Sequence, residues 1–264
     1  MGQEYSHPRP GTPLQVIGLG LPRTGTSSLS AALAVLLDGP VYHGGTQVVR
    51  GPETDVRSLT KVLNQWPPKD ITTDEENKAI IRNLLDGYAA VQDVAPLYAY
   101  VRELPEMYPD AIFICSVRDV ESWEKSMLGL SNSSIPLLIT LLRFILLPIP
   151  TLRLFPGFIA AVRRLMGTLF GEDDVPTRKT WEAHRRLLEE NIPKDRLVFV
   201  SVKDGWEPLC KALGEPVPAG VPFPRINDAK AMDDFAKDAM CKGLLRWALA
   251  IATGGAAAYA YRKL

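Results

Sequence analysis

The sequence predicts an α/β fold of three layers, with a central, mainly parallel sheet and helices on both faces. Three segments support this prediction, because each places a short apolar run before a turn and a helical pattern. The first two segments open with the apolar runs 14–19 and 111–117, and the third opens with residues 196–206, in which the run leads into a turn. Strands that alternate with helices in this way build a parallel sheet covered on both faces. Apolar segments within 125–171 and near the C-terminus predict added apolar helices and a hydrophobic C-terminal helix.

The first segment leads into a loop that is typical of phosphate binding. Residues 18–29 read GLGLPRTGTSSL and run into a helical pattern. In the nucleotide-binding pattern GxxxxGK[ST], backbone amides and the helix N-terminus hold phosphate, the Lys reaches the outer phosphates, and the Ser/Thr binds magnesium. Gly20 and Gly25 stand in register with that pattern, but Thr26 occupies the Lys position and the cation lies earlier, at Arg23. The loop therefore predicts a phosphate site and disfavours a simple nucleoside triphosphatase.

A second motif follows the apolar run AIFICSV at 111–117, which is short enough for a central strand. Arg118 comes directly after it, and Ser126 lies on the helical segment that follows. Arg offers a planar fork of donors to a phosphate, and a Ser hydroxyl adds a neutral donor. Either residue alone would be an ordinary surface side chain. Together, downstream of the first loop, they indicate a second phosphate contact.

Both motifs resemble those of the P-loop sulfotransferases. In that family the loop for the 5′-phosphosulfate runs Pro-Lys/Arg-Ser/Thr-Gly-Thr-Thr/Ser, which residues 22–27 match at every position. The family reads the 3′-phosphate with an Arg at a strand end and a Ser one to two helical turns later, which is the spacing of Arg118 and Ser126. Residues 196–228 closely resemble a subgroup of small sulfotransferase-like proteins, so the resemblance covers about residues 15–228.

The resemblance implies that the donor is 3′-phosphoadenosine 5′-phosphosulfate, without a metal. Arg118 and Ser126 would bind its 3′-phosphate. In related enzymes a late basic loop closes over the nucleotide, and Arg225 within PFPRIND is the candidate here, although the usual Arg-Lys-Gly form is absent. The loop residues expected to hold the 5′ end are Gly20, Pro22, Arg23, Thr24, Gly25, Thr26 and Ser27.

Sulfuryl transfer also requires charge stabilisation and a base. Negative charge builds on the bridging and leaving oxygens, so Arg23 and the loop amides would act as preorganised stabilisers. Two residues compete for the role of base: Asp93, which follows an apolar run, and His43, which follows the helix after the loop. Both are expected at strand ends on the nucleotide side of the sheet. A pKa near neutrality favours His, whereas Asp would need burial. The alternatives are a helix cap at Asp93 and a purely structural His43.

Composition sets the outer limits of the interpretation. The chain has 264 residues, 46% of them hydrophobic, and a formal net charge of zero, which favours one globular domain and argues against a nucleic-acid partner. Its three cysteines are scattered, and the N-terminus lacks an apolar segment, so we expect an intracellular protein with a cytosolic catalytic domain. The expected division is a flexible leader at 1–12, the sulfotransferase-like domain at 13–240, and a hydrophobic helix at 241–264. The oligomeric state is left open.

Residues 243–261 are about as long as a bilayer-spanning helix, with aromatic and basic residues near the ends. Arg246 interrupts the segment, and its Ala/Gly-rich centre is only mildly apolar. Two interpretations follow: a tail anchor in a membrane, which we favour, and a helix packed on the domain.

The stretch 125–171 contains no acidic residue and many apolar ones, which suggests a pocket for an apolar acceptor or a membrane-facing surface. The alternative is two core-packed helices broken by prolines.

His184, on a charged amphipathic helix, is assigned to packing rather than catalysis. The predicted function is sulfuryl transfer to a hydroxyl or amine of a small apolar molecule. The alternatives are a nucleotide-binding or membrane-associated scaffold, and a repurposed enzyme of secondary metabolism.

Overall fold

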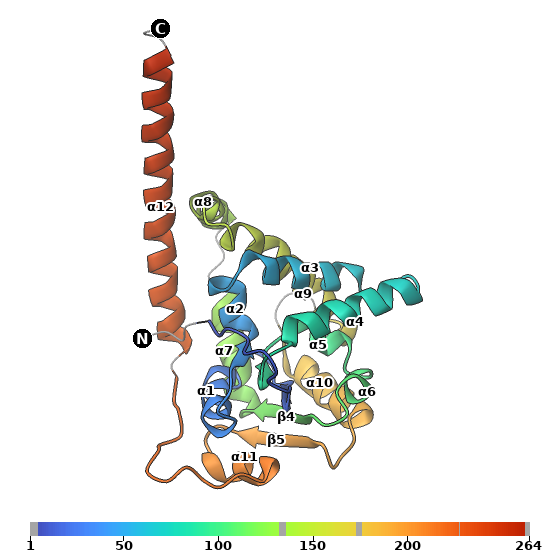
Figure 1. Ribbon diagram of the computed structural model, residues 1–264. Coiled ribbons are helices and arrows are strands. Elements are labelled where there is room, and N and C mark those ends of the chain that lie inside the picture. Colours follow the sequence, from blue (N-terminus) through green and yellow to red (C-terminus); the bar gives the residue numbers. More distant parts are fainter. Residues whose placement is uncertain (1–4, 132–135, 173–175, 227, 262–264) are drawn as a thin grey trace.

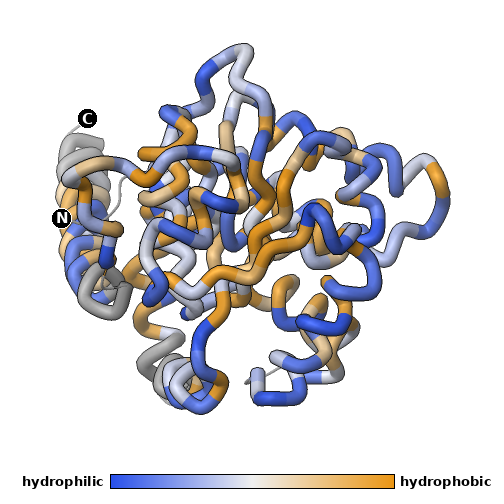
Figure 2. Tube along the Cα trace, turned by 90° about the horizontal axis from the view of Figure 1, so that it is seen from below, coloured by the Kyte–Doolittle hydropathy of each residue, from blue (hydrophilic) through white to orange (hydrophobic). Residues whose placement is uncertain are grey.

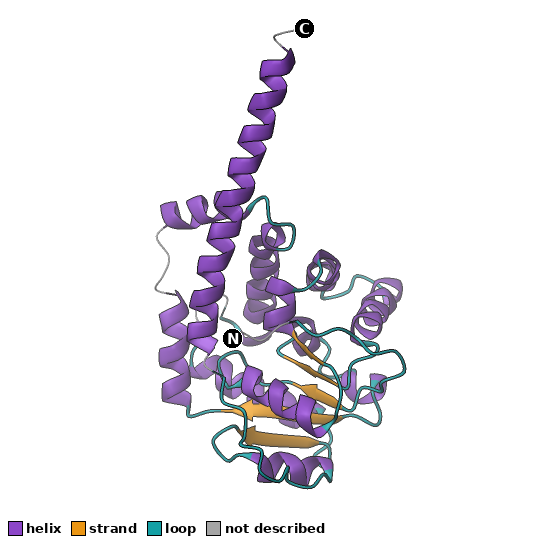
Figure 3. Ribbon diagram, turned by 60° about the vertical axis from the view of Figure 1, so that its left-hand side comes forward, coloured by secondary structure: helices purple, strands orange, loops and turns teal. Residues whose placement is uncertain are grey.

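The computed structural model describes residues 5–131, 136–172, 176–226 and 228–261. Its centre is a five-stranded sheet, ordered β2-β3-β1-β4-β5, in which every neighbouring pair is parallel. The predicted α/β class and parallel sheet are confirmed (Figures 1 and 3). The strands are β1 Val16–Gly18, β2 Val41–His43, β3 Ala90–Gln92, β4 Ile112–Val117 and β5 Leu197–Ser201.

Helices fill the connections between the strands and surround the sheet. The predicted helix after the first loop is α1, Thr26–Leu36, and the helix predicted to end at Gly214 is α11, Trp206–Leu213, whose C-cap Gly214 has a φ of 69°. The others are α2 Gly44–Arg50, α3 Glu53–Gln65, α4 Ile71–Leu85, α5 Ala95–Ala99, α6 Leu104–Met107, α7 Val120–Ser131, α8 Pro136–Leu146, the short 3₁₀ helix η1 Leu152–Leu154, α9 Phe155–Phe170, α10 Arg178–Asn191 and α12 Asp228–Tyr261.

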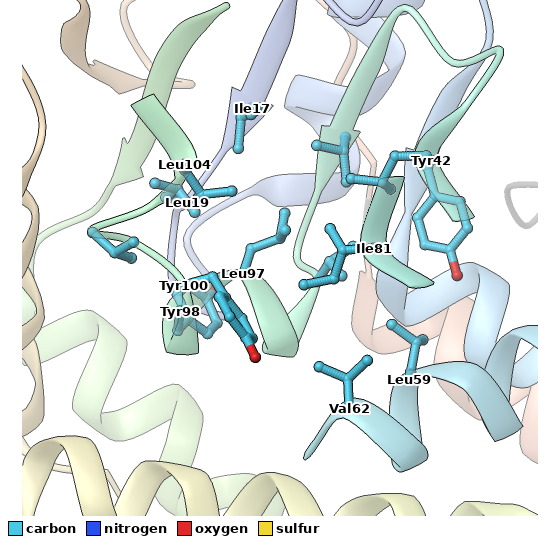
Figure 4. Packing of buried hydrophobic residues seen from close by; sticks show 14 of the residues in the cluster. Ile17, Leu19, Tyr42, Leu59, Val62, Ile81, Leu97, Tyr98, Tyr100 and Leu104 are labelled. Atoms are coloured by element: carbon cyan, nitrogen blue, oxygen red, sulfur yellow. The ribbon is translucent and has the colours of Figure 1, made fainter. Parts of the chain in front are cut away.

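Alternating side chains of the strands separate two cores, as the period of two in a strand requires. Val16, Ala90 and Ile114 belong to the core that α1 and α11 cover. Their sequence neighbours Ile17 and Val91 face the other side, where they pack with residues of α3, α4, α5 and α9. Figure 4 shows part of this second core, in which Leu59 and Val62 of α3 lie toward Ile81 of α4 and Leu97 of α5, with Ile17 of β1 farther away. The hydrophobic segments run through the middle of the domain in Figure 2. These are the three predicted layers.

The order of the strands determines where a ligand site can form. From β1 the chain moves to β2 and β3 on one side, and then crosses to β4 and β5 on the other. The direction of the connections therefore reverses between β1 and β4, and such a switch point opens a crevice at the carboxyl ends of the strands. The predicted loop begins at the end of β1, and Arg118 directly follows β4.

Part of the expected leader packs against the domain. The backbone N–H of Arg9 donates to the carbonyl of Gly87 at 2.8 Å, and its guanidinium donates to the carbonyl of Asp38 at 2.5 Å. The carbonyl of Ser6 accepts hydrogen bonds from Gln47 and from the Tyr88 hydroxyl.

The C-terminal helix α12 differs from its prediction, because it begins at Asp228 and the expected boundary at residue 241 falls inside it. It runs away from the sheet and meets α8 (Figures 1 and 3). Trp247 stacks on Phe144 with ring centroids 4.6 Å apart, and Arg246 donates to the carbonyl of Pro148 at 2.8 Å. Across the parts of the chain that the structure describes, no helix combines the length and the apolarity needed to cross a membrane, so the predicted tail anchor is not supported.

The stretch 125–171 follows neither expectation completely. In α9, Phe158, Ala161 and Leu165 are buried in the main core, as the packing alternative predicts. In α8, by contrast, Leu141 and Phe144 are exposed.

Candidate functional site

The loop between β1 and α1 has a wound backbone of the kind that can bind an anion. Arg23 has a φ of 70° and Gly25 a φ of 97°, both in the left-handed region. That conformation is unusual for a residue with a side chain and marks Arg23 as a constrained position. A Cβ on Gly25 would lie 2.8 Å from Cγ2 of Val202, so the loop also needs glycine there for space. The helix α1 starts directly afterwards at Thr26, and its N-terminal amides favour negative charge.

Side chains behind the loop hold its carbonyl oxygens. The Tyr98 hydroxyl donates to the carbonyl of Gly20 at 2.8 Å, and Trp123 Nε1 donates to the carbonyl of Pro22 at 2.9 Å. The Thr24 hydroxyl donates to the carbonyl of Leu21 at 2.7 Å. Three successive carbonyls are therefore engaged by the protein itself. A phosphate in the loop would meet less repulsion from these oxygens than it would from unbonded ones.

Thr24 and Gly20 serve the shape of the loop. Thr24 is 1% exposed, and its oxygen lies 2.5 Å from the Ser116 hydroxyl of β4. Since the Thr24 proton is donated to Leu21, Ser116 is the donor in this second bond. A Cβ on Gly20 would lie 1.9 Å from Ser116 Oγ, so the close approach of the loop to β4 requires glycine. Thr24, which we expected to contact the nucleotide, is thus placed by the structure in a buried contact with β4.

Five of the predicted residues line one cavity of about 430 Å³ at the switch point. They are Arg23, Gly25, Arg118, Ser126 and Arg225. Ser28 of α1 and Lys203 after β5 join them, although the sequence analysis did not select either. Ser28 accepts a hydrogen bond from the backbone N–H of Ile226 at 2.9 Å, which ties the PFPRIND segment to the loop helix. The cavity is therefore lined by three arginines and one lysine, a setting suited to a ligand with several phosphate groups.

The two predicted phosphate motifs contact each other. Arg23 Nε donates to the Ser126 hydroxyl of α7 at 3.1 Å. The guanidinium of Arg118 donates to the carbonyl of Arg23 at 3.3 Å. Residues about a hundred positions apart in the sequence thus form one connected group.

His43 lies beneath the start of α1, buried to 7% exposure at the end of β2. Its Nε2 is 3.1 Å from the Thr26 hydroxyl and 3.5 Å from that of Ser27. Its Nδ1 accepts the backbone N–H of Thr46 at 3.2 Å. A nitrogen that accepts an amide proton cannot carry one itself, so the neutral ring has its proton on Nε2. His43 therefore donates toward the loop hydroxyls.

Asp93 directly follows β3, half-buried and with a φ of 55°. Its Oδ2 and the His43 ring both lie within 3.3 Å of the point where a Cβ on Gly45 would stand. Burial, together with the nearby Asp93 carboxylate, raises the pKa of the Tyr98 hydroxyl well above its usual value. That hydroxyl is the donor to Gly20, so Asp93 lies close to the loop. The structure thus brings both candidate bases to one end of the sheet, as predicted.

Comparisons with known proteins identify the family. The profile of the sulfotransferase domain family matches residues 15–232. A curated relative, Ava biosynthesis cluster protein M of Aspergillus versicolor, is 28% identical over 225 residues, which cover 81% of this chain and 80% of that protein. Among solved structures, the chain is similar to the sulfotransferase domain of the Synechococcus PCC 7002 olefin synthase, with 16% sequence identity and a TM-score of 0.35. The match covers 83% of this chain and 78% of that one. The chain belongs to the sulfotransferase domain family.

Proposed function

We propose that this protein is a sulfotransferase that moves the sulfuryl group of 3′-phosphoadenosine 5′-phosphosulfate to a hydroxyl or amine of a small apolar acceptor. The observation that carries the proposal is the cavity lined by Arg23, Arg118, Lys203 and Arg225 beside a wound loop and a helix N-terminus. A donor with a 3′-phosphate and a 5′-phosphosulfate needs two anion sites. Arg23 with the start of α1 would form one, and Arg118 with Ser126 the other.

In sulfuryl transfer these residues would stabilise developing charge and would not form bonds to the substrate themselves. As the bond to sulfur breaks, negative charge grows on the leaving oxygens, where a fixed cation is most useful. Arg23 is held for this task by its left-handed backbone and its hydrogen bond to Ser126. Lys203 and Arg225 would bind the nucleoside side of the donor.

The geometry favours Asp93 over His43 as the base. Both ring nitrogens of His43 already face protein groups, and the Nε2 that faces the loop carries the proton. A general base needs an unprotonated atom directed at the nucleophile. Asp93 is half-buried and lies at the same end of the sheet. In this proposal Asp93 accepts the proton of the acceptor, and His43 is a positioning residue that orients the Thr26 hydroxyl.

The acceptor class rests on the stretch 125–171, which has no acidic residue and forms much of α7, α8 and α9. A cationic acceptor would meet no carboxylate in this stretch, whereas an apolar one gains from burial against its many apolar side chains. A second candidate function keeps the nucleotide cavity for other chemistry in secondary metabolism. It is favoured by the name of the fungal relative, a biosynthesis cluster protein.

Calorimetric titration with adenosine 3′,5′-bisphosphate tests the donor site. The expected result is binding of the bisphosphate in preference to ATP, with loss of at least about tenfold in affinity in Arg118→Ala, since a charge-assisted contact contributes about 1.5–3 kcal/mol. Arg102→Ala removes an exposed arginine that does not line the cavity and serves as the matched control. Absence of bisphosphate binding would refute the proposal.

Sulfuryl transfer itself is measured by a donor-dependent screen of phenols, sterols, lipids and amines. Once an acceptor is found, Asp93→Asn should remove most of kcat. His43→Gln should retain the pH profile of the wild-type enzyme while lowering the rate. A change in the pH profile of His43→Gln, with full activity of Asp93→Asn, would reverse the assignment. Bisphosphate binding without transfer to any acceptor would favour the second candidate function.

A further inference from the structure

A second cavity of about 300 Å³ meets the first at Arg118, which lines both. Its lining includes Val117 and Arg118 at the end of β4, Phe199 of β5, and Trp181, His184 and Arg185 of α10. Arg118 is shared with the nucleotide cavity, but the two cavities have no other lining residue in common. Apart from Arg118, the residues proposed to bind the donor therefore do not line this second cavity.

The most informative side chain of the second cavity is His184. It is only 3% exposed, and its Nε2 has no hydrogen-bond partner among the described residues. The nearby Leu19 carbonyl raises the pKa of the ring, as an acceptor beside a ring N–H does, and Nε2 has no partner, so we assign the proton of the neutral ring to the other nitrogen and treat Nε2 as an acceptor. Edge contacts with Tyr98 at 5.6 Å and Phe170 at 6.0 Å hold the ring in place. A buried acceptor that lacks a donor is destabilising, and a ligand with an O–H or N–H would satisfy it.

The remaining walls are aromatic and cationic. Trp181 lies against Trp123 with ring centroids 5.2 Å apart, and the guanidinium of Arg185 stands 4.8 Å above the Phe199 ring. Arg118 supplies a second guanidinium, and the lining residues include no carboxylate, while Arg185 Nε also donates to the exposed Glu189 of the same helix at 2.8 Å. Burial raises the pKa of the Cys115 thiol in the wall to about 12, so the thiol is not a nucleophile here. The cavity thus combines flat apolar surfaces, positive charge and one acceptor.

We propose that this cavity is a second small-molecule site, which binds a monocyclic aromatic acid carrying a ring hydroxyl or N–H. An apolar cavity of about 150 Å³ already admits one benzene ring, so the volume suits one ring with two substituents. The hydroxyl donates to His184 Nε2, the ring lies between Trp181 and Phe199, and the carboxylate faces Arg118 and Arg185. The inference does not depend on the proposed sulfuryl transfer, because it uses the geometry of α10 and β5.

The test uses the full chain without nucleotide and three probes in calorimetry. We expect 4-hydroxybenzoate to bind, and benzoate, which lacks the donor, to bind about tenfold more weakly. Phenol, which lacks the anion, should also bind about tenfold more weakly. Similar affinities for 4-hydroxybenzoate and benzoate would overturn the assignment of His184 Nε2. Absence of 4-hydroxybenzoate binding would overturn the site.

Variants distinguish this site from the nucleotide site. Arg185→Gln should weaken 4-hydroxybenzoate, whereas Arg186→Gln on the same helix, outside the cavity lining, should not. Asp93→Asn should leave binding unchanged, since Asp93 is no part of the lining. Nitrogen NMR of the histidine rings reports directly on Nε2 of His184, whose resonance should move on addition of 4-hydroxybenzoate but not of benzoate. A resonance that stays in place with both would refute the hydrogen bond, and this measurement needs no variant of His184.

Discussion

Acidification should lower the free energy of unfolding through protonation of the buried His184. Burial lowers the pKa of this imidazole from 6.5 to about 4, because a charged ring would lose its hydration in the interior. The unfolded chain therefore takes up a proton at a higher pH than the folded one. Stability is fully present above pH 6.5 and is lost as the pH falls from 6.5 to 4. By proton linkage the whole shift corresponds to about 3 kcal/mol, of which about 2 kcal/mol is lost by pH 5.

The variant His184→Phe isolates this contribution from other titrating groups. It keeps a flat ring against Tyr98 and Phe170 while it removes the proton-binding site. Urea unfolding at several pH values between 7.5 and 5 gives the free energy of unfolding of both proteins. The variant is not expected to match the stability of the wild type at pH 7.5, because the interaction of the ring with the Leu19 carbonyl is lost.

The informative quantity is the change in the difference between the two proteins. It should shift by about 2 kcal/mol in favour of the variant between pH 7.5 and pH 5. His7→Gln, which removes an exposed imidazole, is measured in parallel as the control. If the difference between the wild type and His184→Phe stays constant over this range, His184 is not buried in a neutral form and the reasoning fails.

Two further predictions concern the loop and α10. Gly20→Ala should lower bisphosphate affinity by about tenfold or more, because the added methyl group would stand 1.9 Å from Ser116 Oγ. Gly157→Ala places a methyl group in open space, so this variant should keep wild-type affinity and serves as the control in calorimetry. Glu172→Gln should destabilise the protein by about 1 kcal/mol near neutral pH, since the carboxylate accepts hydrogen bonds from Thr177 and Thr180 at the start of α10. Those bonds outweigh burial and lower the pKa of Glu172 to about 2, so thermal unfolding should show the difference from the wild type shrinking as the pH falls from about 4.5 to 2.

Local patterns were sufficient to predict the elements that carry the site. The apolar runs before the loop and before Arg118 are buried central strands, which leave a strong signal in a sequence. The end of α11 at Gly214 was equally predictable from the sequence, since a left-handed C-cap favours glycine. The start of α12 at Asp228 was not, because the polar residues before 241 carry no apolar pattern while they continue the same helix.

The residues that the sequence did not reveal act through distant contacts. Lys203 looks like any surface lysine until β5 places it beside the loop. Trp123 and Tyr98 read as ordinary core residues, yet their polar atoms hold two loop carbonyls. His184 was assigned to packing, which its burial supports. That its Nε2 has no hydrogen-bond partner among the described residues depends on the residues of other elements around α10, which the sequence pattern does not show. Hydrogen bonds between remote elements leave no periodicity in the sequence.

The loop also explains how a phosphate site can work without the lysine of GxxxxGK[ST]. In that pattern the cation follows the second glycine and reaches back over the phosphates from the helix. Here Arg23 precedes Gly25 and adopts a left-handed backbone, and its side chain donates to Ser126 of α7. Arg118 then donates to the Arg23 carbonyl from the other side. The cation of the loop is thus held by the second motif, so a change at Ser126 or Arg118 should disturb both proposed anion sites at once.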